Sequence, residues 1–231
     1  LPLRLSFVEI VPRTTSMTEK VREPIGTGPY AIRDWEYGQK LILARNDTYW
    51  GDAPAFPVAE YQWRSEGSVR AAMITNDEAD IATGLGPEDG AGDLGVPFQN
   101  NETTALRMQA TEPPLDDIRV RQAINYATNR TGIVKALFRD LGQPAAQLIP
   151  SGVVGYNDQL QPWPHDTDKA KALIDEARAD GVPVDREIRL IGRTAQFPKI
   201  AETIEVMQSE FTEIGLNVKI EMMDTAAQLE Y

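Results

Sequence analysis

The chain has 231 residues and a net charge of −12, from 23 basic and 35 acidic side chains. Such a surface repels nucleic acid and anionic membranes at long range. There is no cysteine and only one histidine, which excludes thiol nucleophiles, disulfides and multi-histidine zinc sites. No apolar run approaches the ~18 residues of a membrane helix, and the length fits one large domain or two small ones.

Strand and turn signals dominate the first part of the chain. Apolar residues recur at a spacing near two over 30–35 and 41–43, on either side of Gly38. This pattern predicts a β-hairpin. The sequence PVAEYQW (57–63) predicts a further strand.

Two glycines, Gly26 and Gly28, precede the hairpin in the sequence GTGPY. A phosphate-binding loop needs its glycines to lead into a helix, whose N–H groups meet the anion. Here they lead into a strand, and no Lys-Ser or Lys-Thr pair follows. We interpret them as allowing a tight backbone path at the strand entry.

After the predicted strands, the spacing of apolar residues changes from that of a strand to that of a helix. Residues 69–73 predict a helix with Ser68 as N-cap and an end at Asn76. Short strands are predicted over 79–83 and 104–108, and the glycine- and acid-rich segment between them is predicted to be a loop.

Helical signals dominate after Pro113-Pro114. Apolar residues at helical spacing between positions 120 and 127 predict one helix, which Asp116 or Asp117 can cap. Apolar residues between positions 133 and 138 predict a second helix, capped by Thr131. The segment 166–181 predicts a third helix, with Gly181 as its C-terminal stop.

The last part of the chain has a strand–helix–strand pattern. Residues 186–192 and 216–223 predict strands, and 198–215 a helix with Pro198 in its first turn. Two strands joined by a helix of this length predict a parallel pair with a right-handed crossover. A two-strand parallel sheet cannot cover both of its faces, so we expect these sheets to be incomplete.

Several side chains have both a chemical and a structural interpretation. His165 could act with Ser151, but the sequence lacks a nucleophile elbow, and a surface or capping role is favoured. The acidic runs at 77–80, 87–93 and 112–117 could form paired carboxylates or calcium ligands. They lack calcium-loop spacing, which favours solvated loops and helix caps.

Three arginines also have both a structural and a ligand-binding interpretation. Arg119 and Arg121 project to different sides of one helix. One can pair with Asp116 or Asp117 and the other can reach a different element, and a structural ion-pair role is favoured over ligand binding. Arg107 interrupts an apolar segment. It either points outward or reaches into a cleft.

Four segments, in order, resemble the family-5 solute-binding proteins of ABC importers, the oligopeptide, dipeptide and nickel-binding group. Residues 24–54 resemble the family's GTGPY hairpin and its Asn-x-x-Tyr-Trp strand end. Residues 65–85 resemble its helix-then-Asp-Ile element, and 113–134 are close to its PF-D-D-x-R-V-R-Q-A-I block, with Asn129 where Asp is common. Residues 165–177 match a later helix.

The resemblance implies an α/β fold of the periplasmic-binding-protein-like type II class with two lobes. Residues 1–112 would be the later part of the first lobe, and 113–231 the opening part of the second. Family members are longer, and the start of this chain lacks signal-peptide features. We therefore expect a central fragment of a periplasmic protein.

The resemblance also implies a ligand between the lobes, which close by hinge motion. Expected cleft residues come from the loop after 79–83, the crossing strand and the end of the second lobe's first strand. They are Thr83, Gly84, Leu85, Ala105, Arg107, Gln109, Gly192 and Arg193. If Arg107 faces the cleft, it favours a carboxylate- or phosphate-bearing ligand.

The implied function is capture of a peptide or similar small polar solute and its delivery to an ABC permease. No catalytic residue, metal, cofactor, nucleic acid or membrane insertion is expected. Two alternatives stay open: a hydrolase that uses paired carboxylates, and a regulatory module that keeps the fold without transport.

Overall fold

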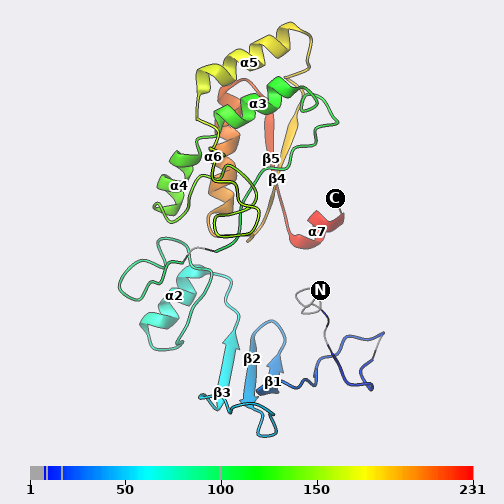
Figure 1. Cartoon of the computed structure of the whole chain (residues 1–231), viewed down its shortest axis with the longest axis vertical. Coiled ribbons are helices and arrows are strands. Elements are labelled where there is room, and N and C mark those ends of the chain that lie inside the picture. Colours follow the sequence, from blue (N-terminus) through cyan, green and yellow to red (C-terminus); the bar gives the residue numbers. More distant parts are fainter. Residues whose placement is uncertain (1–7, 9, 17, 99, 231) are drawn as a thin grey trace. The chain divides into compact units, whose positions relative to one another are not determined.

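The computed structural model describes residues 8, 10–16, 18–98 and 100–230 (Figure 1). The chain separates into two compact units, and the division falls between Val69 and Arg70. Each unit is described by itself. The predicted lobe boundary between residues 112 and 113 is a different division and stays a prediction.

The first unit contains a three-stranded antiparallel sheet in the order β1-β2-β3 (Figure 1). Its strands are β1 (Tyr30–Glu36), β2 (Lys40–Arg45) and β3 (Val58–Gln62). The predicted hairpin and the third strand are therefore confirmed. Gly38 has φ 78° in the hairpin turn, a left-handed conformation that glycine adopts without steric cost.

The glycine pair leads into β1, as predicted, and not into a helix. A Cβ added at Gly26 or Gly28 would meet no atom within 4 Å, and neither residue has a positive φ. The prediction that these glycines allow a tight backbone path was therefore wrong. The Asn46 side chain donates a 3.0 Å hydrogen bond to the Gly28 carbonyl, and its Oδ1 accepts one from the backbone N–H of Thr48. Asn46 thus ties the strand entry to the turn that follows β2.

The division between the units falls within α2 (Gly67–Thr75). This helix was predicted, but it begins at Gly67, so Ser68 lies inside it and not at its N-cap. Residues 79–83 and 104–108 are not strands, so those two predictions were wrong. A strand is defined by hydrogen bonds to a neighbour, and within the described ranges no backbone pairs with either segment in a ladder.

Three helices follow: α3 (Ile118–Ala127), α4 (Arg130–Phe138) and α5 (Thr167–Ala179). Asp117 caps α3, as one of the two predicted alternatives. The N-cap of α4 is Asn129, whose Oδ1 accepts a 2.9 Å hydrogen bond from the Gly132 N–H, so the prediction of Thr131 was wrong. After α5 the chain turns at Gly181 with φ 85°, as predicted.

The chain continues as β4 (Ile188–Arg193), α6 (Ile200–Glu213), β5 (Val218–Met223) and α7 (Thr225–Glu230). β4 and β5 pair in parallel, which confirms that prediction. The helix begins two residues later than expected, so Pro198 precedes α6. In Figure 1, α6 runs alongside the two strands.

The second unit has one hydrophobic core, in which α3, α5 and α6 pack with the parallel strands. Apolar positions of the predicted helices supply most of it. The buried members are Val120, Ala123, Ile124, Ala127, Ala170, Ile174, Ala177, Val184, Leu190, Ile204, Phe211, Ile214, Leu216 and Val218. This core fixes the end of β4 and the start of α6, where part of the predicted site lies.

Candidate functional site

The loop at Thr83 and Gly84 is held by a side chain of α2. Arg70 donates from Nε to the Thr83 carbonyl at 3.1 Å and from Nη2 to the Gly84 carbonyl at 2.8 Å. Gly84 has φ 66°, a conformation that side chains disfavour. A guanidinium presents several donors in a rigid plane, so Arg70 fixes the course of the backbone where the predicted cleft loop begins.

The next residues of this loop contact the segment before α6. Gly86 and Pro87 are buried, and a Cβ at Gly86 would lie 3.8 Å from the Cβ of Pro198. Glu88 Oε1 lies 3.4 Å from Lys199 Nζ. The loop therefore rests against the entry to α6.

Lys199 has two carboxylate partners. Besides Glu88, it lies 3.2 Å from Glu202 Oε1 in the first turn of α6. Hydrogen bonds and charge attraction from Glu202 and Glu88 raise its pKa. The pKa of Glu88 is lowered, chiefly by a backbone hydrogen bond. Desolvation opposes this shift, and Lys199 and Arg139 add to it.

Gly192 and Arg193 occupy the carboxyl end of β4, opposite Met222 and Met223 of β5. Gly192 is buried, and a Cβ there would overlap Ile204 Cδ1 of α6 and lie 2.8 Å from Met222 Sδ. Glycine is therefore needed here for close packing of the strand on the helix. Arg193 is half-buried.

The crossing segment is exposed, apart from one residue. Met108 packs against the core of the second unit, while Ala105, Arg107 and Gln109 are exposed. Gln109 donates a 2.9 Å hydrogen bond to Thr111 Oγ1. Among the described residues, no hydrogen bond or ion pair is formed by the Arg107 side chain.

The structure thus connects two of the three predicted groups. The loop carrying Thr83, Gly84 and Leu85 reaches the chain that follows Gly192 and Arg193 through Glu88 and Lys199. Among the residues that the structure describes, no hydrogen bond or ion pair joins the group at 105–109 to either of them. Whether all eight residues bind a ligand stays a prediction.

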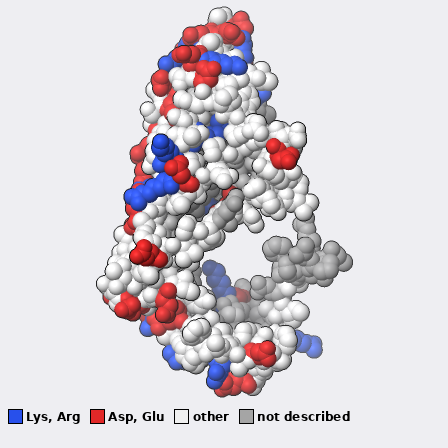
Figure 2. Space-filling model, turned by 60° about the vertical axis from the view of Figure 1, so that its left-hand side comes forward, with Lys and Arg blue, Asp and Glu red and all other residues white. Residues whose placement is uncertain are grey.

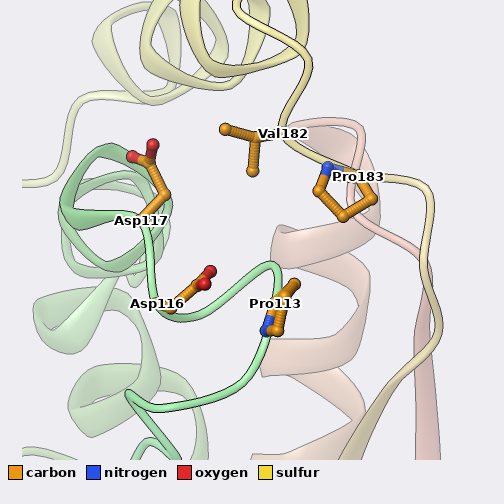
Figure 3. Close-up of a pocket in the computed structure, with 5 residues that line it drawn as sticks. All are labelled: Pro113, Asp116, Asp117, Val182 and Pro183. Atoms are coloured by element: carbon orange, nitrogen blue, oxygen red, sulfur yellow. The ribbon is translucent and has the colours of Figure 1, made fainter.

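A concavity of about 260 Å³ lies elsewhere in the second unit (Figure 3). Asp116 and Asp117, just before α3, face Val182 and Pro183 of the segment after α5, and Pro113 lies at the base in this view. None of the eight predicted residues lines it.

Beside this concavity, Arg119 joins two helix ends. Its guanidinium bonds both carboxylate oxygens of Asp117, at 3.1 and 2.8 Å, and also contacts Asp180 at the end of α5. These contacts lower the pKa of Asp117 and raise that of Arg119. Arg121 donates to the carbonyls of Leu115 and Asp116. The predicted ion pair is therefore present for Arg119, whereas Arg121 bonds backbone carbonyls instead of a carboxylate.

The other candidate groups take structural positions. His165 is exposed, and its Nε2 lies 3.2 Å from Thr167 Oγ1 at the start of α5. In the described part of the chain, no cluster of three or more metal-ligating side chains forms, and no helix is long and apolar enough to cross a membrane. Figure 2 shows acidic and basic side chains interspersed over one face.

Residues 4–231 match the family described as bacterial extracellular solute-binding proteins, family 5, middle part. The chain belongs to this family, as the four sequence segments predicted.

Two curated relatives illustrate the similarity. The dipeptide-binding protein of Escherichia coli K12 is 29% identical over 208 residues, 85% of this chain and 38% of that protein. The glutathione-binding protein GsiB of Salmonella paratyphi A is 29% identical over 90% of this chain and 41% of its own length. The chain therefore spans about two-fifths of the relatives that it matches.

The chain is also similar to solved structures of binding proteins. The periplasmic binding protein DppA of Helicobacter pylori, in complex with the peptide STSA, is 26% identical with a TM-score of 0.74, over 90% of this chain and 41% of that one. AgaA of A. tumefaciens R10, in complex with agropinic acid, is 28% identical with a TM-score of 0.72, over 88% and 42%. These neighbours confirm the predicted α/β class, periplasmic-binding-protein-like type II with incomplete sheets.

Sequence reasoning missed three residues that order this region: Arg70, Glu88 and Lys199. Arg70 interrupts an apolar helix face, and Glu88 lies in an acidic run that we interpreted as a solvated loop. Lys199 directly follows the proline before α6. The charge of each of these three residues was the only signal in the sequence. Spacing along the sequence could not show which residue each one contacts.

Proposed function

We propose that the protein is the ligand-capturing component of an ABC importer, which binds a peptide or similar small polar solute between two lobes and delivers it to a permease. Family membership over residues 4–231 is the observation that carries this proposal. Its relatives are described as binding proteins and not as enzymes. The place of action is extracytoplasmic, and no bond is made or broken.

The relatives and the predicted cleft residues support one ligand class. The named relatives bind dipeptides, di- and tripeptides or glutathione, all of which carry carboxylates. Arg107 and Arg193 are cations on two of the three predicted cleft segments, and a guanidinium can bind a carboxylate through two parallel hydrogen bonds. We therefore propose a ligand with a free carboxylate, with Thr83, Gly84 and Leu85 on the facing wall.

Thermal shift of the full-length protein tests the proposal, with dipeptide and tripeptide pools, reduced glutathione and agropinic acid as probes. A ligand at 100 times its Kd stabilises the folded state by about 2.7 kcal/mol, so Tm should rise with dose. Turnover of a bound probe would favour the hydrolase instead. No shift with any probe would favour the regulatory module.

The carboxylate contact has its own test. For a probe that binds, Arg107→Ala should weaken affinity about 10-fold or more, because hydrogen bonds to charged groups contribute about 1.5–3 kcal/mol. Arg33→Ala, which removes an exposed arginine from β1, is the matched control. Unchanged affinity in Arg107→Ala would remove Arg107 from the site.

A further inference from the structure

The loop from Gly84 to Gly90 meets the start of α6 through an ion pair and through the approach of Gly86 to Pro198. Glu88 and Lys199 form the ion pair at 3.4 Å, and Arg139 at the end of α4 adds attraction on Glu88. Beneath them, Gly86 lies against Pro198. These contacts join two segments that lie far apart in the sequence, around positions 88 and 199.

The two sides of this contact belong to different predicted lobes. Glu88 lies in the segment 1–112 and Lys199 in 113–231. The inference rests on the proposed function, which places the cleft between these lobes. We propose that Glu88 and Lys199 form a latch across the mouth of the cleft, which stabilises the closed state of the carrier.

The geometry on the α6 side prepares Lys199 for this role. Its backbone has φ 68°, a left-handed conformation at the N-cap of α6. Glu202, one turn into the helix, holds the ammonium group at 3.2 Å. A lysine loses rotamer freedom when it forms an ion pair, and the pairing with Glu202 has already restricted it before Glu88 arrives.

The contact is also weak enough to open. The side chains of Glu88 and Lys199 retain 47% and 28% of their exposure, so water screens their attraction. On the loop side, Gly86 is the residue that lies against Pro198, and a glycine has no side chain to bury there. The aromatic contact nearby, between Phe138 and Phe197, lies within the second predicted lobe and does not oppose opening.

A label pair across the cleft tests the latch without any ligand. The chain has no cysteine, so Asn76→Cys and Ser209→Cys place two spin labels on exposed positions of the two predicted lobes. Distance distributions from pulsed spin-label measurements on the full-length protein then report the closed and open populations. Glu88→Gln, Lys199→Gln and the double variant form a thermodynamic cycle.

We expect each single variant to lower the ratio of closed to open protein about two- to fivefold, the range of an exposed ion pair. The double variant should fall little further, because each single change already breaks the pair. High salt, about 1 M, should reduce the closed fraction of the unmodified protein and change Glu88→Gln much less.

A matched control removes the same charge without touching the latch. Asp93→Asn changes an exposed carboxylate that follows the loop in the sequence. The closed fraction should change less in this control than in Glu88→Gln. Equal shifts in Asp93→Asn and Glu88→Gln would overturn the latch, because net charge alone would then explain the effect.

Additive effects of Glu88→Gln and Lys199→Gln, or no shift in either, would also overturn the latch. The thermal-shift series in the unlabelled protein separates this failure from failure of the proposed function. Binding of a peptide with an unchanged distance distribution in Glu88→Gln would reject the latch and retain the carrier. A closed population that depends on Glu88 supports the latch whether or not any probe in the series binds.

Discussion

Gly192 shows how one residue can sit at a predicted ligand position and still be explained by packing. It lies at the carboxyl end of β4, which is where ligands gather in parallel sheets. Its missing side chain also lets Ile204 of α6 pack against the strand. The strand end was predictable from sequence, whereas the partner of Gly192 was not, because spacing carries no information on which helix atom fills the gap.

We predict that Gly192→Ala destabilises the protein without any ligand present. The added methyl group would overlap Ile204 Cδ1, and overpacking of this kind costs about 1–3 kcal/mol. Chemical denaturation measures the loss. Gly28→Ala is the control, because a Cβ there meets nothing within 4 Å.

Adding Ile204→Val to Gly192→Ala should restore part of the lost stability, since it removes the overlapping methyl group. Full stability in the single variant would show that the strand and helix do not pack as closely as this structure has them.

At the scale of elements, the N-cap of α3 was predicted correctly from the sequence, whereas the N-cap of α4 was not. Asp117 precedes α3 in the expected place. At α4, Thr131 is a good N-cap type, but Asn129 takes the role because Gly132 leaves room for its side chain: a Cβ at Gly132 would lie 2.5 Å from Asn129 Nδ2. Two residues of capping type this close in sequence can be ranked only when the backbone is known.

We predict that Asn129→Ala lowers the free energy of unfolding by about 1 kcal/mol, the usual cost of losing an N-cap. Thr131→Ala is the matched control and should change stability by less than half as much, because Thr131 is exposed inside the first turn. Urea titration followed by circular dichroism compares the two. A larger loss in Thr131→Ala would reverse the assignment of the cap.

Helices and strands differed in how far sequence alone could predict them. Apolar periodicity located α3, α5 and α6 because a helix satisfies its own backbone hydrogen bonds. The hairpin and the parallel pair β4–β5 have their partners close in sequence or across one helix. Residues 79–83 and 104–108 have strand-like composition, but a strand also needs a neighbour, and composition does not supply one.

At the scale of the whole molecule, sequence predicted the family and its class of fold but not how its segments meet. The four matching segments are ordered along the chain as in the family. The contact between Glu88 and Lys199 depends on tertiary packing, and neither residue is part of those segments. The predicted site residues were chosen by position along the chain, which explains why their mutual geometry had to come from the structure.

The interior of the second unit also contains an acidic group that links stability to pH. Glu210 of α6 accepts a hydrogen bond from the Asn129 N–H at 3.2 Å through Oε1. Its Oε2 is buried and has no hydrogen-bond partner among the described residues. Burial raises the pKa of Glu210 above the ordinary 4.5, with a further rise from Glu213, while the Asn129 N–H and the charge of Arg130 oppose it.

The sign of the pH effect follows from that shift. The folded protein binds the Glu210 proton more tightly than the unfolded chain, so this contribution is complete below pH 4.5 and is lost as pH rises through the raised pKa. The opposite contributions of Glu88, Asp117 and Glu202, whose pKa values are lowered, are lost below their ordinary values of 4.5, 3.8 and 4.5. The pH range in which the Glu210 contribution changes therefore lies above the range in which the other three contributions are lost.

We predict that Glu210→Gln, which imitates the protonated side chain, gains stability relative to the unmodified protein as pH rises from 4.5 toward neutrality. Urea unfolding at several pH values measures the difference between the two proteins. Glu205→Gln removes an equal charge from an exposed position on the same helix, so its difference should stay flat over this range. A flat difference for Glu210→Gln as well would show that Glu210 is solvated in the folded protein, and the packing of α6 against the start of α4 would then need revision.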